Sequence, residues 1–214
     1  MSGIEIVAAL MGVLSVWLTV RQNIWCWPTG LVMVGLYIWI FFDAKLYSDA
    51  GLQVVYVVLC SYGWYHWARG GDRESALHVT RLKSTAFTAW WLAGLGFAGL
   101  LGFIMSTRTD ASMPYPDAVT TVLSLVAQFL MTRKKLESWV FWISVDVIAI
   151  GVYLMKGLYV TSGLYALFLV LAVLGYLAWK MDLKKHEASF LASSCHLTRD
   201  TGCSADSQSS SATS

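Results

Sequence analysis

The chain has 214 residues, of which 57% are hydrophobic and only 13% are charged, and it contains 11 Trp. Soluble domains carry about 25% charged residues, so this composition excludes an ordinary soluble enzyme, and its high apolar content excludes an intrinsically disordered chain. The net charge of +2 does not indicate nucleic-acid binding, because the basic residues lie in short clusters between apolar runs. The composition therefore predicts an integral protein of the lipid bilayer.

Seven apolar segments follow one another along the chain, each near the ~20 residues that a helix needs to cross hydrocarbon. Helices are expected because an isolated strand would leave its backbone unpaired in lipid. The first segment lacks the basic start and the small-residue cleavage site of a signal peptide, so we expect it to be retained. The predicted helices are 4–20, 24–42, 46–67, 87–106, 117–132, 138–156 and 158–179.

The spacing of the segments indicates an internal duplication. Short links join the first three segments and the last three, whereas longer links at 68–86 and 107–116 set the fourth apart. A shift of 112 positions, without gaps, superposes the first triplet on the last. The pairs include Arg21/Arg133, Trp27/Trp139, Tyr47/Tyr159, Gly51/Gly163, Gly63/Gly175 and Trp67/Trp179. We therefore predict a 3+1+3 parallel repeat, with triplets at 1–68 and 117–180 and a linker helix within 69–116.

The basic residues predict the orientation of these seven helices. Twelve Lys and Arg fall on one side of the predicted membrane and three on the other, and the side with more of them faces the cytoplasm. The N-terminus is then expected outside and the C-terminus in the cytoplasm. Residues 181–214, rich in Ser, Thr and Ala from His186 onward, are predicted to be a disordered cytoplasmic tail.

One acid, Asp146, lies in the middle of an apolar segment. Burying such a charge in the bilayer costs at least ~2.5–3.5 kcal/mol, so it is expected to face a cavity or a partner. Trp139, Trp142 and Asp146 follow an i, i+3, i+7 spacing, which places them on one stripe of a helix. Two indoles and a carboxylate suit a flat cationic ring, as in an aromatic nucleoside or vitamin. The alternative for the two Trp is an aromatic belt at the membrane interface.

Two further polar stripes share this spacing. One carries Thr121, Ser124 and Gln128, and the other carries Gln53 and Tyr56 together with Cys60, which we expect to pack. Such residues either face a substrate or hold helices together by hydrogen bonds. We find no motif for a metal, a cofactor, a phosphate loop or a proton relay, so none is predicted and the pattern fits facilitated diffusion.

Three classes of function are compatible with a membrane-embedded duplicated chain. Repeats related by an axis along the membrane normal commonly enclose a substrate path, which favours a transporter. A ligand-sensing scaffold without flux is the alternative. An intramembrane enzyme would need a second acid or base near Asp146, and a retinal protein would need a lysine in the middle of the last helix. The sequence contains neither the second acid or base nor the lysine, so we expect neither an enzyme nor a retinal protein.

The residues also resemble a known family, the Pnu-type vitamin transporters, and within it the carriers of nicotinamide riboside, an NAD precursor. The resemblance rests on LYSDAGLQ (46–53), SYGWYHW (61–67), SLVAQFLMTRKKLESWVFW (124–142), VDVIAI (145–150), KGLYVTSGLY (156–165) and the signature W-x-x-W-x-x-x-[N/D] at Trp139, Trp142 and Asp146.

The resemblance implies a SWEET-like fold, a homotrimer in the cell's inner (plasma) membrane, and passive uptake of nicotinamide riboside that is trapped by phosphorylation. It places Gln53, Tyr56 and Gln128 around the ligand with the signature residues. Thiamine and riboflavin remain alternative substrates, because some members of the family carry them.

Overall fold

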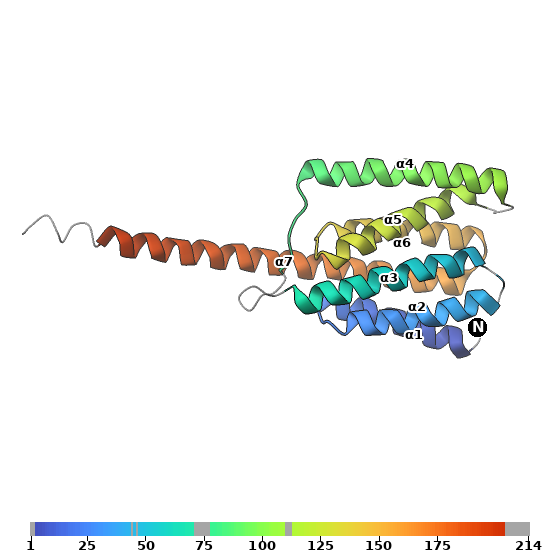
Figure 1. Cartoon of the computed structure of the whole chain (residues 1–214), viewed down its shortest axis with the longest axis horizontal. Helices are drawn as coiled ribbons and strands as arrows, with labels where there is room; N and C mark the ends of the chain where they lie inside the picture. Colours follow the sequence, from blue (N-terminus) through green and yellow to red (C-terminus); the bar gives the residue numbers. More distant parts are fainter. Residues whose placement is uncertain (1–2, 44, 46, 71–77, 110–112, 204–214) are drawn as a thin grey trace, which may run out of the picture. The chain divides into compact units, whose positions relative to one another are not determined.

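The computed structural model describes residues 3–43, 45, 47–70, 78–109 and 113–203, in which all regular elements are helices apart from one isolated bridge. Parts of the linker predicted at 69–116 and the end of the tail predicted at 181–214 lie outside the described residues. The seven helices, shown in Figure 1, are α1 (Gly3–Val20), α2 (Cys26–Asp43), α3 (Tyr47–Arg69), α4 (Ser84–Arg108), α5 (Pro114–Thr132), α6 (Ser138–Met155) and α7 (Tyr159–Cys203).

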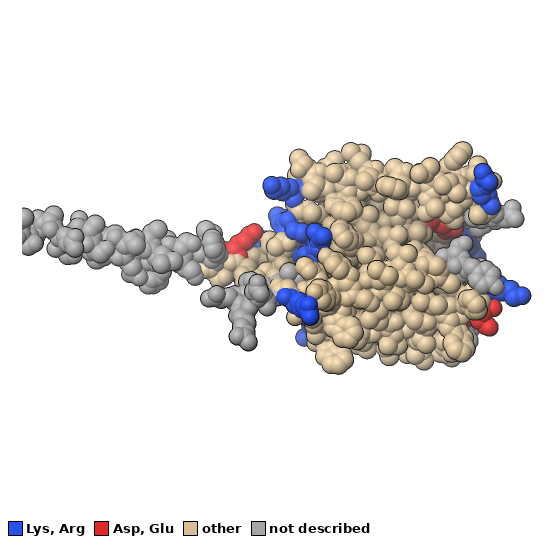
Figure 2. Space-filling view, in the orientation of Figure 1, with Lys and Arg blue, Asp and Glu red and all other residues tan. Residues whose placement is uncertain are grey.

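Five of these helices are long and apolar enough to cross a bilayer: α1, α2, α4, α6 and the Tyr159–Ser189 part of α7. The other two, α3 and α5, are less apolar because they carry the polar stripes predicted from the sequence. Figure 2 shows Lys and Arg at the two ends of the helical body and uncharged residues across the face between them. This distribution is that of a multi-pass membrane protein.

The chain divides into two compact units, Met1–Trp179 and Lys180–Ser214. The described part of the second unit is helical up to Cys203, where the composition predicted disorder from residue 181. No proline follows Pro116, so nothing in the sequence forces α7 to end at the membrane surface. Extending an existing helix also avoids the cost of nucleating a new one.

Local features of the first triplet (α1–α3) recur in the second (α5–α7). Gln22 and Lys134, 112 positions apart, both adopt positive φ, at 54° and 48°. Lys45 and Gly157, in the turns that follow α2 and α6, also adopt positive φ, at 59° and 72°. Turns of the same kind therefore connect equivalent helices in the two triplets.

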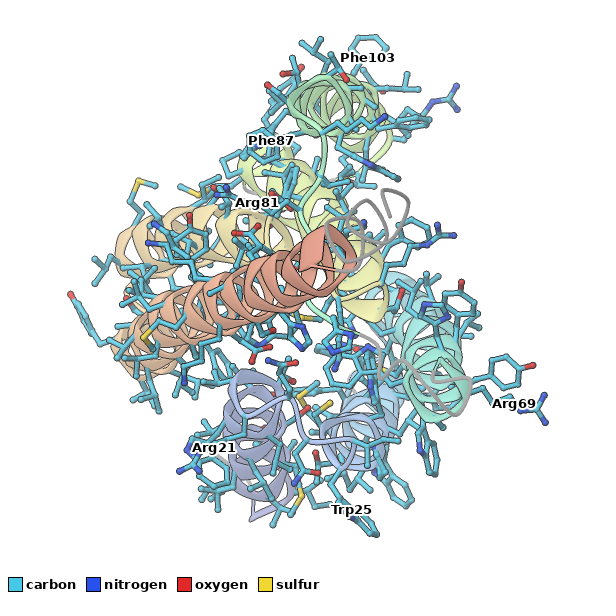
Figure 3. All side chains as sticks on the ribbon, turned by 90° about the vertical axis from the view of Figure 1, so that its left-hand side faces the viewer. Arg21, Trp25, Arg69, Arg81, Phe87 and Phe103 are labelled. Carbon is cyan, nitrogen blue, oxygen red and sulfur yellow. The ribbon has the colours of Figure 1, made fainter. Side chains whose placement is uncertain are left out.

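Helix α4 packs on α5 through a stripe of small residues. Gly94, Ala98 and Gly102 are buried and follow an i, i+4, i+8 spacing on one face. A Cβ on Gly102 would lie 2.7 Å from the ring of Tyr115, so the two helices approach as closely as a glycine allows. Figure 3 shows α4, with Phe103, at the edge of the bundle.

The connection that precedes α4 is attached to the turn between α5 and α6. Thr80 N–H donates to the Lys134 carbonyl at 3.1 Å, and Leu136 N–H donates to the Thr80 carbonyl at 3.0 Å. Glu137 Oε2 accepts a further bond from Leu82 N–H at 2.9 Å. Helix α4 is therefore attached to α5 through its buried face, and the segment that precedes α4 is attached to the turn between α5 and α6.

Candidate functional site

The polar stripes of α3 and α5 meet face to face. The Tyr56 hydroxyl and Ser124 Oγ are 2.5 Å apart, and Gln128 Nε2 donates to Cys60 Sγ at 3.5 Å. Both bonds join residues 68 positions apart, so the two helices run parallel in one register. Gln53 and Thr121 are separated by the same number of positions and therefore occupy the next rung. We name these three pairs, Gln53/Thr121, Tyr56/Ser124 and Cys60/Gln128, the polar ladder.

The bond between Tyr56 and Ser124 is expected to contribute measurably to stability. Tyr56→Phe and Ser124→Ala should each lower the free energy of unfolding by about 0.5–1.5 kcal/mol, because each removes one partner of an enclosed hydrogen bond. The double variant should cost less than the sum of the two, which equilibrium unfolding in detergent measures.

Ser144→Ala provides the control for this cycle, because Ser144 Oγ donates only within its own helix, to the Val140 carbonyl at 2.9 Å. Combined with Tyr56→Phe, it should give additive losses. Additive losses for Tyr56→Phe with Ser124→Ala as well would contradict the ladder.

Asp146 lies on α6 and is buried, with 3% of its surface exposed. Within the described residues no hydrogen bond or ion pair reaches its carboxylate. A buried carboxylate without a donor is unfavourable unless it acquires a proton or binds a partner. The sequence predicted that Asp146 faces a cavity or a partner; the structure buries it inside the bundle, and among the described residues no hydrogen-bond or ion-pair partner reaches it.

Tyr165 on α7 lies near both Asp146 and the polar ladder. It lies within electrostatic range of both Asp146 and Tyr56, and its ring stacks on Tyr153 of α6 at a centroid distance of 5.2 Å. Tyr165 was not among the residues predicted from the sequence. The duplication contains the signal that identifies it, because Tyr165 is the counterpart of Gln53 under the 112-residue shift.

The two tryptophans of the predicted stripe have different surroundings. Trp139 is 1% exposed and packs edge-on against Trp179, at a centroid distance of 5.4 Å. Trp142 is half-buried and packs against the apolar cluster of α5 and α6 that includes Leu123 and Phe141. Trp139 therefore contacts α7 two turns from Asp146, whereas Trp142 packs toward α5 and stays partly exposed.

Buried indole N–H groups mark the equivalent positions of the two triplets. Nε1 of Trp27 and Nε1 of Trp139 are both buried without a hydrogen-bond partner among the described residues. A buried donor left unpaired costs about 1–3 kcal/mol. Trp139 thus offers a donor on the same stripe as the carboxylate of Asp146.

The arrangement is suited to binding and not to bond making. A carboxylate, two tyrosine hydroxyls and an amide can hold a cation and accept bonds from hydroxyl groups of a ligand. Among the residues described, no group of three His, Cys, Asp or Glu could hold a metal ion. A shallow apolar groove of about 290 Å³ lies elsewhere, on α2 and α3, lined by Leu31, Ser61, Trp64, Tyr65 and Ala68.

Apolar helices around enclosed polar groups define a multi-pass helical membrane protein. Residues 2–181 match the model of the nicotinamide mononucleotide transporter family. The chain belongs to this family, which confirms the resemblance seen in the sequence and makes it a member of a transporter family rather than of an enzyme family.

Relatives with known roles match over most of the chain. The nicotinamide riboside transporter PnuC of Escherichia coli (strain K12) is 30% identical, over 84% of this chain and 85% of its own. The riboflavin/roseoflavin transporter RibM of Streptomyces davaonensis is 27% identical, over 82% and 83%. The crystal structure of the vitamin B3 transporter PnuC superposes with a TM-score of 0.70 at 26% identity, covering 86% of this chain and 83% of that one.

Proposed function

We propose that this protein carries nicotinamide riboside across the cell's inner membrane by facilitated diffusion. The observation that carries the proposal is the buried carboxylate of Asp146, which has no hydrogen-bond partner among the described residues, in a chain whose relatives include a nicotinamide riboside transporter. The nicotinamide ring of that nucleoside is cationic and its ribose supplies hydroxyl donors. A carboxylate next to tyrosine and amide groups complements both parts.

The proposed binding site combines Asp146, Trp139 and Trp142 of α6 with the polar ladder, including Gln53, Tyr56, Thr121, Ser124 and Gln128. We add Tyr165, because it lies within electrostatic range of both Asp146 and Tyr56. Asp146 is almost fully buried, so a ligand reaches it only after helices separate. Binding and transport are therefore linked to opening of the bundle, as in a carrier.

The architecture that we propose is the 3+1+3 parallel repeat of SWEET-like proteins, with all seven helices in the membrane, the N-terminus outside and the C-terminus in the cytoplasm. The recurring turns and indole contacts support the duplication, and the basic residues support the orientation. Trimerisation is part of the same proposal and rests on the family resemblance alone.

A riboflavin carrier is the second candidate, favoured by the 27% identity to RibM. Riboflavin has no cationic ring, so the acid at Asp146 would gain no charge pairing from it. Thiamine, whose thiazolium ring is cationic, fits the acid as nicotinamide riboside does. We favour nicotinamide riboside over thiamine because the PnuC relatives are named as nicotinamide riboside transporters.

Uptake by proteoliposomes tests the proposal. Purified protein should equilibrate radiolabelled nicotinamide riboside across the bilayer without an ion gradient or ATP, whereas riboflavin should accumulate no faster than in empty liposomes. Flux of riboflavin or thiamine alone would contradict the assigned substrate. Binding of nicotinamide riboside without flux, measured by thermal shift, would contradict transport and indicate a ligand-sensing scaffold.

A further inference from the structure

Four indoles form a continuous chain between the two triplets. Trp27 packs edge-on against Trp67 at 5.3 Å, and the equivalent pair Trp139 and Trp179 packs at 5.4 Å. The inner members, Trp67 and Trp179, meet across the triplets at 6.2 Å. The row of four indoles is therefore arranged symmetrically with respect to the two triplets.

The inner indoles also form reciprocal hydrogen bonds. Trp67 Nε1, near the end of α3, donates to the Thr132 carbonyl at the end of α5, at 3.1 Å. Trp179 Nε1, on α7, donates to the Thr19 carbonyl at the end of α1, also at 3.1 Å. The third helix of each triplet is therefore bonded to the first helix of the other.

A third contact joins the two equivalent turns. Lys134 Nζ lies 3.2 Å from Gln22 Oε1 and 4.5 Å from the centre of the Trp67 ring. Lys134 is only 9% exposed, although most lysines lie at the surface. We name the Trp67–Thr132, Trp179–Thr19 and Lys134–Gln22 contacts the latch.

The latch lies between the candidate binding site and the end of the bundle that carries Arg21, Arg69 and Arg81. Figure 3 views the molecule from this end. Trp67 follows Cys60 of the polar ladder by seven residues, and Trp139 precedes Asp146 by seven, a distance of about 10 Å along each helix. A ligand that leaves Asp146 toward the basic end must therefore pass the latch.

We propose that the latch is the gate on the basic side of the bundle, and that its three contacts break together when the two triplets separate to release the substrate. The inference rests on the proposed transport function. Each contact joins one triplet to the other, so relative rotation of the triplets breaks all three at once. Each is also individually weak, as a reversible gate requires.

Cys60 provides a reporter for gate opening that needs no substrate. It is 5% exposed and belongs to the polar ladder, seven residues before Trp67 of the latch. In a full-length chain with Cys26→Ala, Cys195→Ser and Cys203→Ser, Cys60 is the remaining thiol. N-ethylmaleimide applied from the basic side should label Cys60 at least several-fold faster in two latch variants than in the parent chain. These variants are Trp67→Phe, which loses the N–H donor and keeps a ring, and Lys134→Met. The matched control Trp64→Phe, on the same helix but 42% exposed, should leave the rate unchanged. Equal labelling rates in all variants would overturn the gate.

A cross-link supplies a test that does not depend on a weakened fold. Gln22→Cys and Lys134→Cys in an otherwise cysteine-free chain, joined by a short reducible cross-linker, should hold the two triplets together at the latch. Flux should then fall at least tenfold and recover on reduction, while ligand-induced thermal stabilisation persists. Undiminished flux in the cross-linked protein would overturn the gate and leave the proposed transport intact. Absence of flux before cross-linking would contradict transport, and the Cys60 rates would still test the latch.

Discussion

Gly63→Ala and Gly175→Ala are expected to destabilise the bundle more than other single-methyl additions along α3 and α7. A Cβ on Gly63 would lie 2.2 Å from Cη2 of Trp27, and one on Gly175 would lie 2.5 Å from Cη2 of Trp139. Both indoles are buried, so neither ring can swing aside without displacing its partner in the indole chain. Overpacking of this kind costs about 1–3 kcal/mol. Thermal unfolding in detergent should show it as a shift of roughly 2–4 °C per kcal/mol.

Gly51→Ala and Gly163→Ala are the matched controls, one per triplet, also related by the 112-residue shift. Nothing lies within 4 Å of a Cβ at either position. Alanine should there be neutral or stabilising by up to about 1 kcal/mol, because it is the better helix former. A similar loss of stability in all four variants would contradict the close approach of Trp27 and Trp139 to their glycines.

Asp146→Ala is expected to lower the kcat/KM of nicotinamide riboside uptake by roughly 30-fold or more. Truncating one member of a buried charge pair costs about 2 kcal/mol or more, and each 1.4 kcal/mol is about tenfold. Asp146→Asn should lose less, about tenfold, because its amide oxygen still accepts a hydrogen bond although the charge assistance is gone. Initial rates of uptake in proteoliposomes should decrease from the wild type to Asp146→Asn and further to Asp146→Ala.

Stability measurements separate this loss from misfolding. Asp146 has no bonded partner among the described residues, so replacing it should leave the thermal stability of the ligand-free protein unchanged or slightly raised. Uptake by Asp146→Ala at the wild-type rate would show that the carboxylate does not contact the substrate. An equal loss of uptake for a neutral ligand would show that the charge of Asp146 does not contribute to recognition of the cationic ring.

Helix type and approximate position could be predicted for this chain because both depend on nearby residues. A run of about 20 apolar side chains must span hydrocarbon as a helix whatever its neighbours are. The stripe of Thr121, Ser124 and Gln128 likewise follows from helical geometry alone. The structure of the tail from residue 181 was harder to predict. Its polar composition does not indicate a helix, and yet it contains no proline that would end α7.

The contacts that form the candidate site could not be predicted in the same way. The rungs of the polar ladder join residues 68 positions apart, and the Trp179–Thr19 bond joins residues 160 positions apart. Such pairs depend on how each helix is rotated and shifted against its neighbours, which side-chain volumes across the whole bundle decide together. Periodicity placed Trp139 on the stripe of Asp146, but only packing against Gly175 and Trp179 shows that this indole belongs to the chain between the triplets.

Hydropathy and helical period act over one or two turns, so they were enough to predict a membrane protein of apolar helices with a 112-residue repeat and one acid inside an apolar segment. Helix packing was needed to show that Tyr165 lies within electrostatic range of both Asp146 and Tyr56, and that Trp67 and Trp179 each bond to the opposite triplet. The physical reason is that interhelical contacts are set by close packing, which is a property of all the helices jointly and not of any one segment.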